Sequence, residues 1–502
     1  MPEGLVFIAN LGNRDIALNV GDEDSPRWLA FGKDQEGEEV RKYLGLEQGG
    51  TRGIAAQLRR NPPRPERLRL PILEPALQLV LEQFGRIAQL VLIGTSNPPD
   101  ERSHSLWDTI ESAHLIKEHI LFHRFRSDEI EAVEVIEYLG NPSSFEDAVS
   151  FFSEFLGARA SAFGRAVASI RGGTPALNQA LSTQLVALYG PKAALVETTE
   201  PPPEARVKGE LGAARFVDTW PLRRNAILRA LRALIQRHDY SGALKLLDDE
   251  EIETSTTEKI RALLGHGQAR LNLDFSQAFE ALEGLQGVPE IDSLRESAGE
   301  DYAWTSVRLR DIERSARVQW ERSDWIGFVT RVAMFCETCC RQLVWHLTGF
   351  KPQGGQVFVQ DLSRYLGRRG VKSLLEDLSL KDDANSIPIT RKTLDALIQI
   401  GKIGESSERA KTAREITDFL QELKAVEELR HRALHDLRGI NEAELRQRLP
   451  GGQLSGAGKS YQSVVDRILG RMETLEQTPD RLPRRDPYVR LRNLLLSEID
   501  RL

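Results

Sequence analysis

The sequence predicts an α/β domain followed by two all-helical regions. In the first 220 residues, short apolar runs alternate with amphipathic stretches, as in a doubly wound parallel sheet covered by helices. After Pro221 the apolar residues fall at helical spacing and the alternation stops. A length of 502 residues is enough for about two to four domains. We therefore predict three, at residues 1–221, 222–310 and 311–502.

The strands of the predicted sheet are short runs rich in β-branched residues, typical of buried parallel strands. They are residues 5–9, 90–93, 132–136, 166–170 and 193–196. Residues 106–121 and 145–155 are amphipathic and are expected to be helices between the strands. The proline-rich residues 200–204 are expected to form a loop before a final hairpin. A ligand of such a sheet binds at the carboxyl ends of the strands.

Residues 222–310 are interpreted as an all-α connector. The sequence DYSGA at residues 239–243 recurs as DFSQA at residues 274–278, which is 35 residues later. This offset is close to the period of tetratricopeptide helix pairs. Coincidence within an ordinary helical bundle explains so short a match equally well.

Residues 311–502 are predicted to form a compact all-α bundle. The expected helices are residues 318–347, 391–400, 406–437, 441–448 and 461–475. The glycine-rich residues 349–355 and 367–370 are expected to be loops between them.

The composition is that of an ordinary globular protein, with 40% hydrophobic and 28% charged residues. No window holds the roughly 18 apolar residues that a membrane helix needs, and the first residues lack the basic start of a secretory signal. We therefore expect a cytoplasmic protein with no membrane partner. The net charge of −7 argues against a general nucleic-acid coat protein, and no DNA partner is expected. Basic residues slightly outnumber acidic ones from Asp311 onward, so an RNA contact is more natural there.

The strongest chemical signal is the sequence RHRALH at residues 430–435. Histidine, with an unperturbed pKa of about 6.5, can accept or deliver a proton near neutral pH. Arginine is permanently charged and matches phosphate oxygens. His431 and His435 share a helix face, whereas Arg430 and His435 are five residues apart and do not stack. These residue types suit attack of a ribose 2′-hydroxyl on the adjacent phosphate, without a metal.

One copy of this motif supplies few groups for a complete catalytic site, which suggests that a dimer axis brings two copies together. An alternative stays open on spacing alone. Arginine and histidine near a helix C-terminus also favour the helix dipole, and short motifs match often by accident.

A second candidate site lies at residues 170–178, IRGGTPALN, after a predicted strand and before a predicted helix. Gly172 and Gly173 allow backbone amides to approach a ligand closely. Thr174 suits the cap of the helix and Pro175 its first position. A helix N-terminus of this kind binds anions such as phosphates. An ordinary strand-to-helix turn is the alternative.

Two further polar loops follow the first two strands, at residues 10–15 and 94–97. Because the carboxyl ends of parallel strands meet at one edge, we predict a nucleotide site there. The candidate ligand-binding residues are Asn10, Gly12, Asn13, Arg14, Asp15, Thr95, Ser96, Arg171, Gly172, Gly173, Thr174 and Asn178.

The C-terminal motif resembles the signature of HEPN ribonucleases, which is Arg, a polar residue, three residues and His. Arg430, His431 and His435 match it. The resemblance implies a helical bundle that dimerises so that two motifs face each other and cleave single-stranded RNA without a metal. It implies His435 as the principal acid and base, Arg430 as the group that stabilises phosphate charge, and His431 as an assisting residue. The implied product ends are 2′,3′-cyclic phosphates.

The loops at residues 10–15 and 171–178 resemble those of CARF domains, which are Rossmann-like sensors of cyclic oligoadenylates. CARF, connector and HEPN in this order resemble the ancillary ribonucleases of type III CRISPR systems. This implies a homodimer activated by cyclic tetra- or hexa-adenylate, with no cofactor. A non-catalytic sensor or adaptor and a ribonuclease toxin of a toxin–antitoxin pair stay open as alternatives. Slow cleavage of the activator near Thr174 and Asn10 is a further hypothesis.

Three other patterns are interpreted as structural, and no metal site is predicted. Residues 452–460 resemble a phosphate-binding P-loop but lack a required glycine and a preceding strand. His119 and His123 lack the residue order of zinc proteases. The three cysteines and His346 lie on one predicted helix and cannot converge on a metal, so core packing is expected.

Overall fold

The computed structural model describes residues 4–47, 49–97, 104–252, 254–300, 304–353, 355–381, 384–400, 408–435, 439–456, 458–476 and 486–502. The chain divides into two compact units, Met1–Ile227 and Leu228–Leu502. Each unit has its own apolar core. The boundary between connector and bundle at residue 310 stays a prediction.

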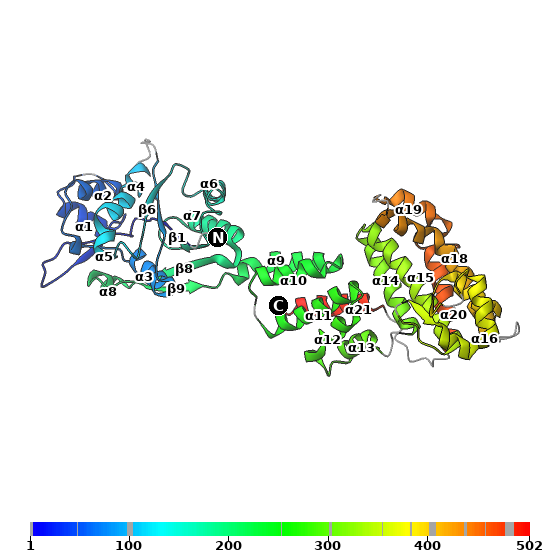
Figure 1. Cartoon of the computed structure of the whole chain (residues 1–502). Helices are drawn as coiled ribbons and strands as arrows, with labels where there is room; N and C mark the ends of the chain where they lie inside the picture. Colours follow the sequence, from blue (N-terminus) through cyan, green and yellow to red (C-terminus); the bar gives the residue numbers. More distant parts are fainter. Residues whose placement is uncertain are drawn as a thin grey trace. The chain divides into compact units, whose positions relative to one another are not determined.

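The first unit is built on a six-stranded sheet in the order β6-β5-β1-β7-β8-β9 (Figure 1). The strands are β1 (Leu5–Asn10), β5 (Gln89–Thr95), β6 (Val133–Tyr138), β7 (Arg165–Ser169), β8 (Ala193–Thr199) and β9 (Ala213–Val217). Neighbours are parallel except β8 and β9, which form an antiparallel hairpin. The five predicted strands are confirmed. A final hairpin is present, but residues 200–204 lie inside it, between β8 and β9, and not before it as predicted. The loop inside this hairpin contains a short helix, α8 (Pro203–Val207).

Helices cover both faces of this sheet. α6 (Phe145–Gly157) and α7 (Pro175–Tyr189) pack on the face to which Val6 of β1 belongs. α3 (Leu73–Phe84) packs on the opposite face, with Phe7. Successive residues of a strand point to opposite faces, so a strand buried on both sides is apolar throughout. The predicted α/β class is confirmed.

A small three-stranded antiparallel sheet in the first unit was not predicted from the sequence. Its order is β3-β2-β4. Its strands and the two helices beside them in the sequence are β2 (Ala17–Asn19), β3 (Trp28–Ala30), α1 (Gln35–Tyr43), α2 (Thr51–Arg60) and β4 (Leu68–Arg69). Strands of two or three residues are too short to show an alternating pattern.

The helix predicted at residues 106–121 is confirmed from Ile110 onward, but it is interrupted by a π-helical turn. α4 (Ile110–Leu115) leads into a π-helical turn, Ile116–Ile120, and then into α5 (Leu121–Arg124). Trp107 lies before α4, at the end of a 3₁₀ turn. The spacing of apolar residues in the sequence does not reveal the wider π turn, because the apolar residues stay buried through it.

The second unit begins with a run of consecutive helices, the last four of which pack each on the next. They are α9 (Trp220–Gln236), which spans the boundary between the units, α10 (Tyr240–Asp249), α11 (Ser255–Leu271), α12 (Phe275–Glu280) and α13 (Pro289–Ala298). This is the helical connector region expected from the sequence.

The repeated sequence in the connector marks a helix–helix turn that occurs three times. His238, Leu273 and Ser323 have positive φ, and the Asp that follows each of them caps the next helix. The Asp side chain accepts a hydrogen bond from the N–H three residues later. Its own N–H donates to the carbonyl five residues earlier. Because these turns are unevenly spaced along the chain, the helices that they join do not form a regular solenoid.

The third turn divides the residues predicted as one helix at 318–347, and that prediction is wrong. The chain forms α14 (Ser306–Glu321) and α15 (Trp325–Thr348), which pack against each other. Ser323, with φ of 58°, is in the left-handed region, where an L-residue cannot continue a right-handed helix.

α14 and α15 pack with α18 (Glu408–His435) and α20 (Tyr461–Glu476) around one apolar core (Figure 1). Smaller elements surround this bundle: β10 (Gln356–Phe358), α16 (Val359–Asp377), β11 (Ser386–Pro388), α17 (Arg391–Ile400) and α19 (Glu442–Arg448). The helices predicted at residues 391–400, 441–448 and 461–475 are confirmed. The helix predicted at residues 406–437 is confirmed from 408 to 435, and its two ends lie outside the described residues.

The loop predicted at residues 367–370 is wrong. These residues belong to α16, which kinks at Gly367 with φ of 73° and ψ of 166°, values that only glycine adopts readily. In the parts of the chain that the structure describes, no helix is long and apolar enough to cross a bilayer.

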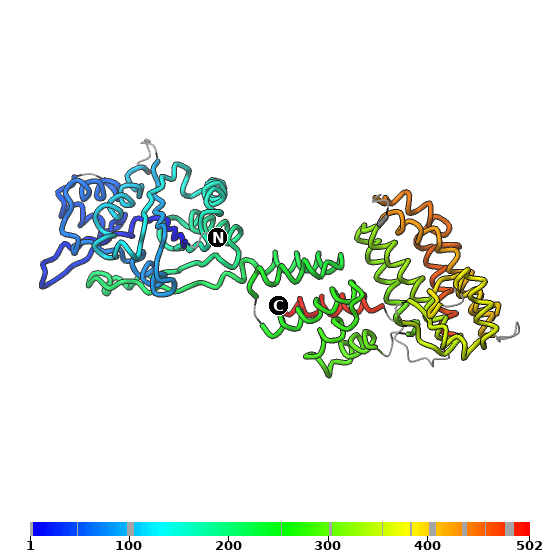
Figure 2. The backbone as a smooth tube through the Cα atoms, viewed as in Figure 1, coloured from blue at the N-terminus to red at the C-terminus, as the bar shows by residue number. Residues whose placement is uncertain are grey.

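The last helix, α21 (Pro487–Ile499), does not extend the bundle. It packs on α11 and α13 of the connector (Figure 2). Lys259 of α11 pairs with Glu498 at 2.7 Å, and Tyr488 donates to the Arg270 carbonyl at 3.3 Å. The C-terminal helix therefore packs on the connector, although the bundle helices precede it in the sequence.

Candidate functional sites

The polar loops that follow β1 and β7 meet at the carboxyl edge of the sheet. Gly12 lies so close to the other loop that a Cβ there would be 2.8 Å from the nitrogen of Gly173. Asn10 donates through Nδ2 to Asn178 Oδ1 at 3.0 Å. Since β1 and β7 are neighbours in the sheet, the two loops are held backbone to backbone. Glycine is required at this contact.

α7 begins as the sequence predicts. Thr174 Oγ1 accepts a hydrogen bond from the N–H of Leu177 at 3.3 Å, and Pro175 occupies the first turn. Gly172 and Gly173 have φ of 82° and 54°, which favours glycine. The free amides and the dipole of this helix end favour an anion.

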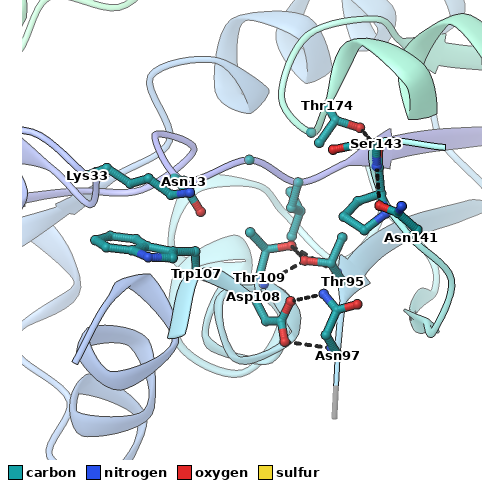
Figure 3. Close-up of a pocket in the computed structure, with 14 residues that line it drawn as sticks. Asn13, Lys33, Thr95, Asn97, Trp107, Asp108, Thr109, Asn141, Ser143 and Thr174 are labelled. Atoms are coloured by element: carbon teal, nitrogen blue, oxygen red, sulfur yellow. Dashed lines mark hydrogen bonds between the residues drawn. The ribbon is translucent and has the colours of Figure 1, made fainter. Parts of the chain in front are cut away.

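Two cavities flank the contact between Gly12 and Gly173. The first, of about 550 Å³, is lined by loops after β1, β5, β6 and β7 (Figure 3). The second, of about 580 Å³, is lined by loops after β1, β7 and β8. Most predicted ligand residues line one cavity or both: Gly12, Asn13, Arg14, Asp15, Thr95, Arg171, Gly172, Gly173, Thr174 and Asn178. Asn10 and Ser96 are buried and line neither.

The cations of the second cavity are already paired. Arg14 lies 2.5 Å from Asp34 and 3.1 Å from Glu200. Arg171 lies 3.4 Å from Glu197. An anionic ligand must compete with these carboxylates, so the arginines of this cavity are less available than the sequence implied.

Asp15 is fully buried in the wall of the second cavity, with 2% of its surface exposed. Its carboxylate accepts a hydrogen bond from the N–H of Gly12. Burial raises the pKa of Asp15 to about 7, against the hydrogen bond from Gly12 and helped by the charge of Glu200. Asp15 therefore titrates near neutral pH beside the predicted phosphate site.

The structure adds a group of residues to the first cavity that no sequence motif marks: Lys33, Trp107, Asp108, Thr109, Asn141 and Ser143. Lys33 follows β3 of the small sheet, and Trp107 precedes α4. Their positions depend on the tertiary packing of segments far apart in the sequence. A polar loop after β6, the next strand of the sheet, was the one available signal for Asn141 and Ser143.

The C-terminal motif lies at the end of α18. Arg430 Nη1 is 3.0 Å from Glu337 Oε1 on α15, and their side chains are 36% and 47% exposed. A cavity of about 840 Å³ lies beside this pair, between residues of α15, α17 and α18. Its charged lining is Glu337, Arg341, Arg391, Lys392, Asp395, Lys424, Glu427, Glu428, Arg430 and His431.

The motif residues divide between two sides of α18. His431 is exposed and lines the cavity with Arg430. Arg432 instead pairs with Glu444 of α19 at 2.6 Å. The side chain of His435 lies outside the described residues, so its relation to Arg430 stays a prediction.

The structure places two of the patterns that were interpreted as structural. Within the described ranges, no group of three or more His, Cys, Asp or Glu side chains could hold a metal ion. Cys336, Cys339 and Cys340 are buried in the bundle core as predicted, and burial raises the pKa of Cys340 to about 12. Residues 452–460 follow α19 and a 3₁₀ turn, with no strand before them.

The fold is that of an α/β unit followed by a unit of helices. No protein-family model and no curated protein matches the sequence. Among solved structures, the chain is similar to "Enterococcus italicus Csm6 bound to cyclic hexa-2'-fluoro-hexa-dAMP". The TM-score is 0.55, the sequence identity is 11%, and the match covers 100% of both chains. The resemblance to CARF–HEPN proteins is thereby confirmed at the level of the fold.

Proposed function

We propose that this protein is a homodimeric endoribonuclease of type III CRISPR defence that cyclic oligoadenylates activate. The first unit binds the activator, and the bundle cleaves single-stranded RNA without a metal and leaves 2′,3′-cyclic phosphate ends. The observation that carries the proposal is the full-length likeness to Csm6, a structure solved with a cyclic hexanucleotide analogue. Both candidate sites of this chain lie within the residues that the match covers.

The activator site is the carboxyl edge of the six-stranded sheet. Phosphates bind at the amides of Gly173 and Thr174, where the α7 dipole favours negative charge. The Gly12 contact allows the backbone to approach the ligand. The cavities on its two sides have the size of ordinary small-molecule sites.

The RNA site combines one permanent cation and two histidines. Arg430 neutralises charge on the reacting phosphate. His435 moves the proton between the 2′-hydroxyl and the leaving oxygen, and His431 assists it. Since one chain supplies few groups for both proton transfers, two chains share the site across a dimer axis.

A direct test is His435→Ala in the full chain, assayed with labelled RNA, cyclic tetra- or hexa-adenylate and EDTA. We expect cleavage by the wild type and a loss of about 100-fold or more in the variant, as for removal of a general acid or base. His123→Ala, at an exposed histidine of α5, is the matched control and should cleave normally. Retained cleavage by His435→Ala would remove His435 from the mechanism, and abolition of wild-type cleavage by EDTA would contradict the metal-free account.

The same assay separates the alternatives. A sensor or adaptor binds the activator and cleaves nothing. A toxin-like ribonuclease cleaves without an activator. Titration with the two ring sizes also identifies the activator.

A further inference from the structure

The first cavity has an aromatic wall that a phosphate-binding loop does not require. Of the described residues that line it, Trp107 is the only aromatic one. Figure 3 shows Trp107 and Lys33 on one side of the cavity and Thr174, Ser143 and Asn141 on the other. Trp107 is partly exposed, unlike the core tryptophan Trp28. Part of its surface therefore stays available to a ligand.

The indole of Trp107 is held rigidly from behind. A Cβ at Gly50 would lie 2.9 Å from Trp107 Cε3, so the main chain at the start of α2 packs directly against the ring. A side chain at position 50 would displace it. Because Gly50 has no side chain, the indole keeps this position and forms a preformed surface for a ligand.

The segment that carries Trp107 is also tied to the end of β5. Asp108, which is 2% exposed, accepts hydrogen bonds from the main-chain and side-chain nitrogens of Asn97 at 2.6 and 2.7 Å. Thr95 and Thr109 exchange main-chain to hydroxyl hydrogen bonds at 3.0 and 3.2 Å. Folding has therefore already ordered the Trp107 ring, and the binding of a ligand costs no further side-chain entropy there.

Lys33 places a positive charge over the face of the ring, in a cation–π contact. Its Nζ lies 5.1 Å from the centroid of Trp107, and no carboxylate of the described residues pairs with it. This contrasts with Arg14 and Arg171 in the second cavity, which are paired. Of the two cavities, the first therefore offers the more available cation.

We propose that Trp107 is the stacking platform for one base of the cyclic oligoadenylate, and that Lys33 contacts a phosphate next to that base. The inference rests on the proposed function and assigns the two cavities different roles. The first binds base and phosphate, and the second cavity, whose arginines are paired with carboxylates, contributes the Gly12–Gly173 edge. Stacking on an aromatic ring is tolerant of base identity, so this platform supplies affinity and leaves base selection to other groups.

The test compares Trp107→Ala and Trp107→Phe in the full chain by calorimetric titration with cyclic tetra- and hexa-adenylate. Removal of a stacking ring should weaken binding about 5- to 150-fold, and phenylalanine should restore most of it. Tyr43→Ala is the matched control. Tyr43 is an exposed aromatic residue under Arg67 and lines neither cavity, so its removal should leave affinity unchanged.

Two further readouts report on the contact itself. Ligand should quench part of the wild-type tryptophan fluorescence, and this part should be missing in Trp107→Phe. Lys33→Gln should bind more weakly and show a smaller loss of affinity with added salt, whereas Lys42→Gln, at an exposed lysine of α1, should behave as wild type.

The outcomes distinguish this inference from the function on which it rests. Wild-type protein that binds neither ring refutes the proposed function and the inference with it. Wild-type protein that binds, together with Trp107→Ala of undiminished affinity, refutes the base platform alone.

Discussion

The structure predicts a large and specific effect of Asp311→Ala on the second unit. Arg270 of α11 and Asp311 of α14 are 1% and 2% exposed, and they form a buried ion pair with an Nη2–Oδ2 distance of 2.6 Å. Removal of one partner from such a pair leaves an uncompensated buried charge, which costs about 3–5 kcal/mol. Arg308, also buried nearby, loses the same compensating charge.

The remaining contacts of Arg270 decide what a second substitution does. His266 Nδ1 donates to the Ala278 carbonyl at 2.7 Å, and its Nε2 accepts from Arg270 at 3.2 Å. Burial, with the nearby charge of Arg270, lowers the pKa of His266 to about 3, so it is neutral and suited to accept. The double variant Arg270→Met with Asp311→Leu removes both charges of the pair and leaves His266 Nε2 without its donor. The lost donor costs about 1–3 kcal/mol. Since Arg308 lacks Asp311 in both variants, the double variant should be the more stable of the two.

The assay is urea unfolding followed by tryptophan fluorescence. At an m-value of about 3 kcal/mol per M, Asp311→Ala should lower the midpoint by about 1–1.7 M. The exposed pair Arg446–Glu442 supplies the control, since Glu442→Ala should cost less than about 1 kcal/mol. A cost below about 1 kcal/mol for Asp311→Ala, or a double variant less stable than the single one, would refute the reasoning.

Three more predictions test other parts of the chain. Because the pKa of Asp15 is raised from 3.8 to about 7, its stabilising contribution is fully present below about pH 4 and is lost as pH rises through 7. Asp15→Asn should therefore flatten the free energy of unfolding between pH 4 and 7, and an unchanged pH profile would contradict the raised pKa. Glu337→Gln should change the RNA cleavage rate less than about 5-fold, because the exposed pair with Arg430 is worth about 0–1 kcal/mol, whereas Arg430→Gln should abolish cleavage. Truncation before residue 486 removes α21, whose buried side chains contribute about 1.5–3 kcal/mol each. Limited proteolysis should then cut the connector, while removal of residues 500–502 alone should leave it resistant.

Local chemistry was enough to predict the elements that bring the first site together. Runs such as residues 5–9 are apolar on both faces, because helices cover both sides of the strand. Thr174 and Pro175 are a cap and a first-turn residue in the structure as in the sequence. In both cases the residue type has one favoured structural role, so the local sequence is enough to predict the element.

Features that depend on distant segments could not be predicted in this way. Trp107 reaches the cavity because Gly50 packs behind it, a contact between residues that share no pattern. The break at Ser323 requires a non-glycine residue with positive φ, which propensity argues against. The return of α21 to the connector follows from contacts such as that of Tyr488 with Arg270, and nothing local to residues 486–502 indicates its partner.

The energetics of the Arg430–Glu337 pair bear on how the proposed nuclease activity is controlled. Both side chains are more than one-third exposed, and a pair of this kind holds a side chain by about 0–1 kcal/mol. That is a factor of about 5 at most, which is too little to keep a ribonuclease inactive until its activator arrives. We infer that control lies in the assembly of the shared site from two chains, since a change in the distance between two motifs removes groups from the reaction entirely. Under this scheme Glu337→Gln leaves the dependence on activator intact, and a Glu337→Gln variant that cleaves at full rate without activator would place the control in the ion pair instead.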